Sequence, residues 1–140
     1  MTMEVNAVST DDAPLVGFSG NTKAPLSQAI VANGFVYCSG QGPLDPKTHT
    51  IATEDFEEQA QLTLENMLRV VEAAGSSKDR IVKCNCYVKD MENFPKFNAV
   101  YRAFFEECPQ FPARTTVQAS PPREGVLVEV ECVALAGEGK

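Results

Sequence analysis

The chain has 140 residues, 44% of them hydrophobic, and a formal net charge of −7. This length accommodates one domain and leaves no room for a second of ordinary size. The 12 lysines and arginines form no run, which argues against a nucleic-acid-binding surface because phosphate contact needs clustered positive charge. No apolar run is long enough to cross a bilayer, and residues 1–12 lack the basic flank and apolar segment of a secretion signal. We expect a cytosolic protein with small ligands; an organelle form whose transit peptide was removed stays open.

The five cysteines are an odd number, and a chain this apolar needs no disulfide, so we expect free thiols. Cys84 and Cys86 share one face of a predicted strand, but the other cysteines supply no second pair at metal-ligand spacing. We therefore expect thiols that pack in the core and bind no metal. Cys108 lies near a predicted helix end and should be the most exposed.

The N-terminal half begins with a polar segment, residues 1–23, which shows no sustained periodicity and predicts an irregular arm before a single domain at 24–136. Strand-like runs at 27–32 and 35–39 flank Asn33-Gly34, the signature of a two-residue hairpin turn. The proline- and glycine-containing segment that follows predicts a loop.

A long helix follows this loop. Apolar residues between positions 56 and 74 recur with a period of 3.6, which predicts one buried stripe. Thr53 is a plausible N-cap, and Gly75 supplies a left-handed residue at the C-terminal end.

A strand at 81–88 and a second helix come next. The helix carries its apolar residues between 97 and 108 at helical spacing. Asp90 or Asn93 can start it, and Pro95 suits its first turn.

The chain ends in two strands separated by a Pro-Pro loop, and Arg114 lies at the start of the first. In the second strand one alternating set is apolar and indicates a face on the core: Val128, Val130, Cys132 and Ala134. The other set mixes carboxylates with apolar side chains: Leu127, Glu129, Glu131, Val133 and Leu135. Because this face is too apolar for free solvent and too charged for a core, we expect it to meet a second copy of the chain.

The predicted order of elements is ββαβαββ. Two helices that alternate with strands predict an α/β sandwich of the α+β kind, in which a mixed sheet carries both helices on one face. The other face of the sheet is left bare.

Five separated segments resemble the RidA/YjgF family of enamine and imine deaminases, many of which are described as L-PSP endoribonucleases or translation inhibitors. The segments are Pro25-Leu26-Ser27-Gln28-Ala29, Ser39-Gly40-Gln41, Pro43-Leu44-Asp45-Pro46-Lys47-Thr48, Phe111-Pro112-Ala113-Arg114 and Val128-Glu129-Val130-Glu131. The resemblance runs from residue 24 to 136 and is specific, since all five segments agree in order and spacing. It implies a chorismate-mutase-like fold and a homotrimer with a site in each cleft between subunits.

The resemblance also implies roles for single residues. Arg114 matches the arginine that grips the substrate carboxylate with its planar guanidinium. Glu129 matches the glutamate that positions water, and a partly dry cleft would raise its pKa toward the working pH. The residues that it places around the substrate are Ser39, Gly40, Gln41, Leu26, Asn98 and Thr116.

Plainer interpretations stay open beside these roles. Arg114 could be a surface or ion-paired arginine, and Asn98 an ordinary helix surface residue. For Glu131, beside Glu129 on the same face, we expect a salt bridge between subunits.

Two positions depart from the family pattern. Where the family usually has Gly-Pro-Tyr or Gly-Pro-Phe, this chain has Ala24-Pro25-Leu26, so the aromatic ring that covers the substrate is absent. The position two after the arginine, small or thiol-bearing in the family, is Thr116. These departures put the substrate range and the rate in question.

The favoured function is hydrolytic deamination of small 2-imino or 2-enamino acids to 2-keto acids and ammonia, with neither cofactor nor metal. The expected partners are a carboxylate-bearing metabolite and further copies of the chain. One alternative is an L-PSP-type endoribonuclease or translation inhibitor, against which the acidic charge and the single histidine, His49, both weigh. The other is a trimer that binds a metabolite without turning it over.

Overall fold

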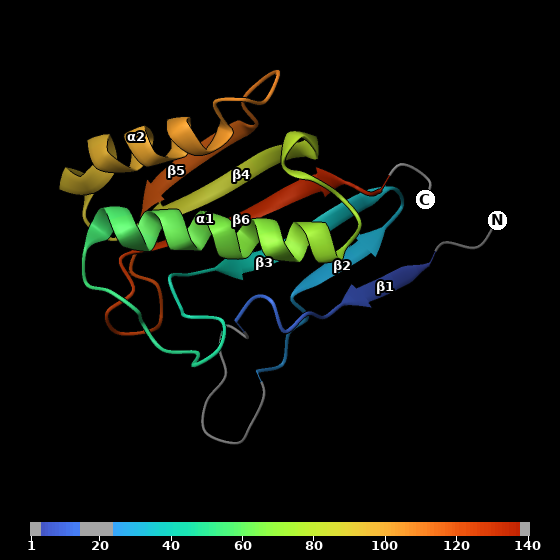
Figure 1. Cartoon of the computed structure of the whole chain (residues 1–140), viewed down its shortest axis with the longest axis horizontal. Coiled ribbons are helices and arrows are strands. Elements are labelled where there is room, and N and C mark those ends of the chain that lie inside the picture. The colour runs from blue at the N-terminus through green and yellow to red at the C-terminus, as the bar shows by residue number, and fades with distance from the viewer. Residues whose placement is uncertain (1–3, 15–23, 138–140) are drawn as a thin grey trace.

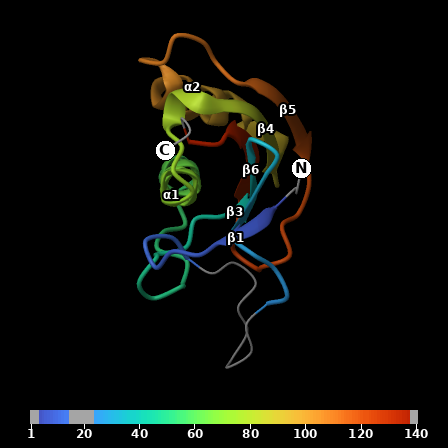
Figure 2. The same cartoon turned by 90° about the vertical axis from the view of Figure 1, so that its right-hand side faces the viewer.

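A mixed sheet forms one layer of the molecule and two helices form the other (Figures 1 and 2). The computed structural model describes residues 4–14 and 24–137. Its strands are β1 (Val5–Val8), β2 (Ala29–Ala32), β3 (Phe35–Gln41), β4 (Ile81–Val88), β5 (Ala113–Gln118) and β6 (Val128–Leu135). Its helices are α1 (Phe56–Ala73) and α2 (Phe94–Phe105), with short 3-10 turns η1 (Lys78–Arg80) and η2 (Met91–Asn93). The predicted α+β sandwich is confirmed, with one strand added at the N-terminus.

The strands follow the order β1-β2-β3-β6-β4-β5 across the sheet. β4 and β5 run parallel, and the other neighbours run antiparallel. The hairpin between β2 and β3 turns at Asn33 and Gly34, which both adopt positive φ as the Asn-Gly signature requires. In this strand order β6 lies in the middle of the sheet, and β5 forms one edge.

The prediction that the N-terminal arm is irregular throughout was wrong. Val5–Val8 form an edge strand antiparallel to β2. Most of their side chains are exposed, so no buried face imposes an alternating pattern that the sequence could show. Gln28 fastens the segment that follows, since its side-chain amide donates to the carbonyls of Ala13 and Pro14, both at 3.3 Å. Residues 1–3 and 15–23 of the predicted arm lie outside the described residues.

The first helix starts two residues later than predicted. Asp55 is the N-cap, and its Oδ2 accepts a hydrogen bond from the backbone N–H of Glu58 at 3.0 Å. Thr53 instead donates its hydroxyl to the Glu58 carboxylate at 2.6 Å. A carboxylate is favoured at this position because it also complements the positive end of the helix. Gly75, with φ of +86°, follows the helix as predicted.

Each of the two predicted start residues precedes a helical segment: Asp90 precedes η2 and Asn93 precedes α2. Asp90 caps η2 by accepting from the N–H of Glu92 at 2.9 Å, and Asn93 precedes α2, whose first turn contains Pro95.

The core lies between the helices and one face of the sheet. α1 packs against β3, β6 and α2. The apolar set of β6 is buried there as predicted: Val128, Val130, Cys132 and Ala134. All five cysteines are free thiols; four are buried and Cys108 is the partly exposed one, as the sequence indicated. No helix in the described ranges has the length and apolar character that a membrane span needs.

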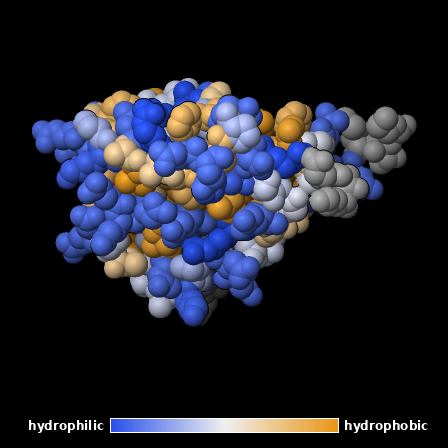
Figure 3. Space-filling view, turned by 45° about the horizontal axis from the view of Figure 1, so that its top comes forward, coloured by the Kyte–Doolittle hydropathy of each residue, from blue (hydrophilic) through white to orange (hydrophobic). Residues whose placement is uncertain are grey.

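No helix among the described residues covers the opposite side of the sheet, which we call the bare face (Figure 2). It carries the mixed set of β6, whose Glu129, Glu131 and Val133 are half-buried. Tyr37 of β3 and Leu135 of β6 are 48% and 36% exposed there. The surface on the helix side is mainly hydrophilic, with apolar residues scattered over it (Figure 3).

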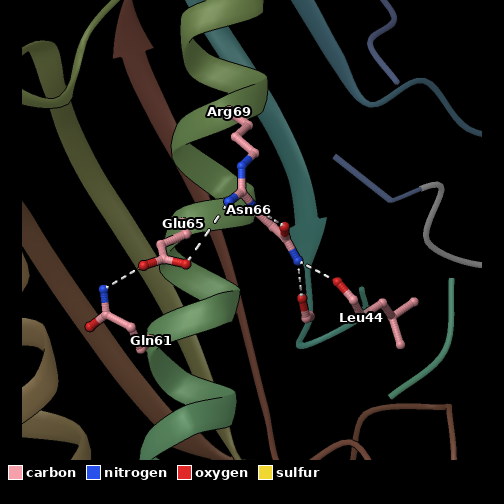
Figure 4. A network of polar contacts seen from close by, with 6 residues as sticks. Leu44, Gln61, Glu65, Asn66 and Arg69 are labelled. Atoms are coloured by element: carbon pink, nitrogen blue, oxygen red, sulfur yellow. Dashed lines mark hydrogen bonds and ion pairs between the residues drawn. The ribbon is translucent and has the colours of Figure 1, made fainter. Parts of the chain in front are cut away.

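A buried amide ties the loop after β3 to the middle of α1 (Figure 4). The Nδ2 atom of Asn66 donates to the carbonyls of Gly42 and Leu44, both at 2.9 Å. Arg69 donates to Oδ1 of Asn66 at 2.7 Å and holds the amide in this orientation. The network fixes the end of β3 against the helix.

We predict that Asn66→Ala lowers the free energy of unfolding by about 2 kcal/mol, because two buried hydrogen bonds of about 1 kcal/mol each are lost. Gln61→Ala is the matched control, since this amide donates to Glu65 on the exposed side of the same helix. It should cost less than about 0.5 kcal/mol. Urea unfolding of both variants measures the difference, and equal losses would contradict a structural role for the buried amide.

Candidate functional site

Arg114 projects from edge strand β5 toward α2. Its backbone pairs with that of the buried Cys84, so both side chains lie on the helix-covered face of the sheet. The guanidinium carbon lies 4.8 Å from the ring centroid of Tyr101, and 5.6 and 5.7 Å from those of Phe94 and Phe97. The rings hold the cation in place and leave its charge unneutralised.

A cavity of about 180 Å³ opens beside Arg114. It is lined by Asn98, Tyr101, Arg102, Phe111, Pro112 and Arg114, and we call it the Arg114 cavity. The ion pairs among the described residues join Arg69 to Glu65 and Lys78 to Glu107. Arg114 therefore forms no ion pair with a described acidic residue. The structure thus brings Arg114 and Asn98 together and leaves a guanidinium available to an external carboxylate.

Thr116 lies on the same face of β5 as Arg114, opposite Cys86, but does not line the cavity.

The two buried thiols near Arg114, Cys84 and Cys86, are poor nucleophiles. Burial raises the pKa of Cys84 to about 11 and that of Cys86 to about 12, so both stay protonated near neutral pH.

Glu129 lies on the bare face. Its neighbours along β6, Val128 and Val130, point into the core, and Glu129 therefore points away from it. The carboxylate packs directly against Gly40 of β3, where a Cβ atom would overlap it. The structure brings these two predicted site residues together, and glycine is required at position 40 to keep the carboxylate where it is.

The pKa of Glu129 is raised above its ordinary value, first by burial and then by the negative charge of Glu131. Glu131 accepts a hydrogen bond from Nδ2 of Asn85 at 3.2 Å, whereas Glu129 has neither a hydrogen bond nor an ion pair among the described residues. A partly dry carboxylate with a raised pKa can accept a proton and return it.

β3 continues two residues beyond its predicted end at residue 39, so Gly40 and Gln41 also lie within the strand. The backbone N–H of Ser39 donates to the carbonyl of Gln28 at 2.9 Å, and the Ser39 hydroxyl donates to the carbonyl of Ser27 at 2.6 Å. The side chain of Gln41 is buried in the core and is not brought to Glu129. Of this segment only Gly40 is placed against a predicted catalytic residue.

Leu26 precedes β2 and is 41% exposed. It does not line the Arg114 cavity within the chain.

Arg114 and Glu129 lie on opposite faces of the sheet. They are also two strands apart, because β4 runs between β5 and β6. Neighbouring strands are spaced by about 4.8 Å, so the lateral separation alone is about 10 Å. One copy of the chain therefore does not bring the two residues to one small substrate.

No group of three or more His, Cys, Asp or Glu side chains in the described part of the chain is arranged to hold a metal ion.

The family of this chain follows from comparison with known proteins. A family model described as Endoribonuclease L-PSP matches residues 19–136. The chain belongs to the RidA/YjgF family. Its RidA/YjgF relatives include the RutC family protein PH0854 of Pyrococcus horikoshii, 43% identical over 110 residues that make up 79% of this chain and 86% of the relative. The 2-iminobutanoate/2-iminopropanoate deaminase of Salmonella typhimurium is 39% identical over 129 residues, 91% of this chain and 95% of the relative.

Solved structures of the RidA/YjgF family share the fold. The YjgF gene product of E. coli superimposes with a TM-score of 0.81 at 35% identity and covers 93% of this chain and 98% of its own. E. coli TdcF with bound serine gives a TM-score of 0.82 at 32% identity, with coverage of 94% and 99%. The predicted family and fold class are thus confirmed.

Four residues that line the Arg114 cavity were not predicted as site residues from the sequence: Tyr101, Arg102, Phe111 and Pro112. Arg102 follows Asn98 by four residues, so helical spacing already places the two on one face. Phe111 and Pro112 stand in one of the segments that carry the family resemblance, but no local pattern places them on the cavity wall, because only the tertiary fold brings the loop before β5 against α2.

We predict that Glu131→Gln lowers the pKa of Glu129, because a negative charge that disfavours ionisation of Glu129 is removed. Titration of the Glu129 side-chain carboxyl by ¹³C NMR measures this shift. Glu124→Gln, a change on an exposed loop, is the control and should leave the pKa unchanged. An unaltered Glu129 titration in Glu131→Gln would show that the two carboxylates are not coupled.

Proposed function

We propose that this chain is a cofactor-free deaminase that hydrolyses small 2-imino acids, and their 2-enamino tautomers, to 2-keto acids and ammonia. The observation that carries the proposal is the unpaired Arg114 guanidinium held over aromatic rings beside a cavity. A relative 39% identical to the chain is named 2-iminobutanoate/2-iminopropanoate deaminase. The serine bound to the related TdcF is itself a small molecule with one carboxylate.

Arg114 binds the substrate carboxylate through two parallel N–H donors and fixes the position of the imine carbon. The imine carbon is already electrophilic, so correct placement supplies a large part of the rate. Glu129 accepts a proton from water as the water oxygen bonds to this carbon, and it passes the proton to the imine nitrogen. The hydroxyl proton of the tetrahedral adduct then follows the same route, the carbon–nitrogen bond breaks, and ammonia leaves as the carbonyl forms. Glu129 ends the cycle ionised, as it began.

Because Arg114 and Glu129 lie on opposite faces of the sheet, the proposed site takes in a second copy of the chain. In the proposed site Arg114 of one subunit faces Glu129 of its neighbour across an interface formed by the bare face. The exposed apolar side chains on that face, Tyr37 and Leu135 among them, favour such burial. A homotrimer is the assembly that the family resemblance favours.

Single substitutions test the two roles. Arg114→Ala should lower kcat/KM by about 10- to 150-fold, which is what loss of a charged hydrogen-bonding partner costs. Glu129→Gln should lower kcat by about 10²-fold or more with a smaller effect on KM. The assay follows 2-iminobutanoate released in place by a threonine dehydratase and trapped by semicarbazide. Arg123→Ala, on an exposed loop, is the control.

Full activity in Arg114→Ala would assign this arginine to structure. RNA cleavage by the same preparation, lost in Glu129→Gln, would favour the activity that the family model's description names. Ligand binding without turnover would favour a metabolite-binding protein.

Mixed subunits test the shared site. Arg114→Ala and Glu129→Gln chains, each inactive alone, are co-refolded in equal amounts. If two subunits supply each site, about a quarter of the sites regain both residues at random mixing, and about a quarter of the activity returns. A site built within one chain would regain none.

A further inference from the structure

A second arginine lines the same cavity as Arg114. Arg102 lies on α2 four residues after Asn98, so both point to one side of the helix. Its guanidinium carbon lies 5.8 Å from the ring centroid of Phe111, another residue of the cavity wall. The contact holds the guanidinium of an otherwise exposed side chain at the mouth of the cavity.

The positive charges of the two arginines are not neutralised by acidic residues of the described chain. The ion pairs there involve Arg69 and Lys78. Glu106, one helical turn beyond Arg102, forms no ion pair with it. A chain of net charge −7 thus gathers two unpaired cations around a cavity of about 180 Å³. Like charges that line one small space repel each other, and a bound dianion would relieve the repulsion.

We infer that Arg102 binds a second carboxylate, so that the Arg114 cavity favours 2-imino dicarboxylic acids, the imines of the aspartate and glutamate type. This inference rests on the proposed deaminase function for its reaction. Arg114 takes the carboxylate next to the imine, and Arg102 takes the distal one. The rings of Tyr101 and Phe111 offer apolar surface to the methylene groups between them. A monocarboxylic imino acid leaves Arg102 without a partner.

Arg102 also lies in the last turn of α2, where a positive charge complements the negative end of the helix dipole. That role predicts an effect on stability and none on ligand choice. A test that measures both quantities separates the two roles.

The inference is tested first with unreactive ligands, so that binding is measured apart from catalysis. Isothermal titration compares glutarate with butyrate on the assembled protein. We expect glutarate to bind about fivefold more tightly, the upper range for a solvent-exposed ion pair, and expect added salt to shrink this preference. Arg102→Gln should abolish the preference by weakening glutarate binding about fivefold more than butyrate binding. The matched control Arg123→Gln should retain it.

The kinetic counterpart is the ratio of kcat/KM for 2-iminoglutarate and 2-iminobutanoate, which Arg102→Gln should lower by the same factor. If the protein binds glutarate no more tightly than butyrate, or if Arg102→Gln retains the preference for glutarate, the inference is overturned while imine hydrolysis stands. Failure of both ligands to bind overturns it as well. An Arg102-dependent glutarate preference without turnover of either imine supports the ligand class and rejects the deaminase.

Discussion

The alternation of side chains along a strand is the constraint on which this molecule depends. Successive residues point to opposite faces of a sheet, so β6 cannot bury Val128 and Val130 without turning Glu129 away from the helices. The same rule on β5 places Arg114 beside the core residue Cys84, under α2. Each chain consequently keeps the two halves of the proposed site apart, a cationic cavity on one face and a carboxylate on the other, and we call them half-sites. Chemistry that needs both residues becomes a property of an assembly.

Buried amides of α1 hold the carboxylate half-site in place from inside the fold. Asn66 fastens the loop after β3, close to Gly40. Gln59 accepts the N–H of Leu127 at 2.8 Å and donates to the carbonyl of Gly125 at 2.9 Å, and so fastens the loop that leads into β6. Polar residues on the buried side of a helix are costly unless every donor and acceptor finds a partner. Here the partners of the two amides include backbone groups of the loops, which have no hydrogen-bond partner on a neighbouring strand. Helix α1 thereby positions the end of β3 and the start of β6, which meet at the carboxylate of Glu129.

The cationic half-site is held by contacts of a different kind. Aromatic rings around Arg114 and Arg102 supply apolar packing and a modest attraction, and neither removes the positive charge. An internal carboxylate would stabilise these arginines more and would also occupy them. Cations packed on rings stay accessible to an external anion, even in a chain of net charge −7.

Local pattern was sufficient to predict the two helices, the Asn33-Gly34 hairpin and the buried set of β6, because periodicity and turn chemistry depend on near neighbours. The family was predicted from the resemblance of five separated segments. The sequence also predicted that Arg114 and Asn98 belong to one site, through the family resemblance, and the structure places them on one cavity. It did not show the edge strand β1, whose exposed residues carry no alternation, nor the fact that the Ser39 N–H is already bonded. Only the tertiary structure separated Arg114 from Glu129 and set Arg102 beside Arg114, because strand order and helix packing join residues distant in the chain and no local pattern encodes those distances.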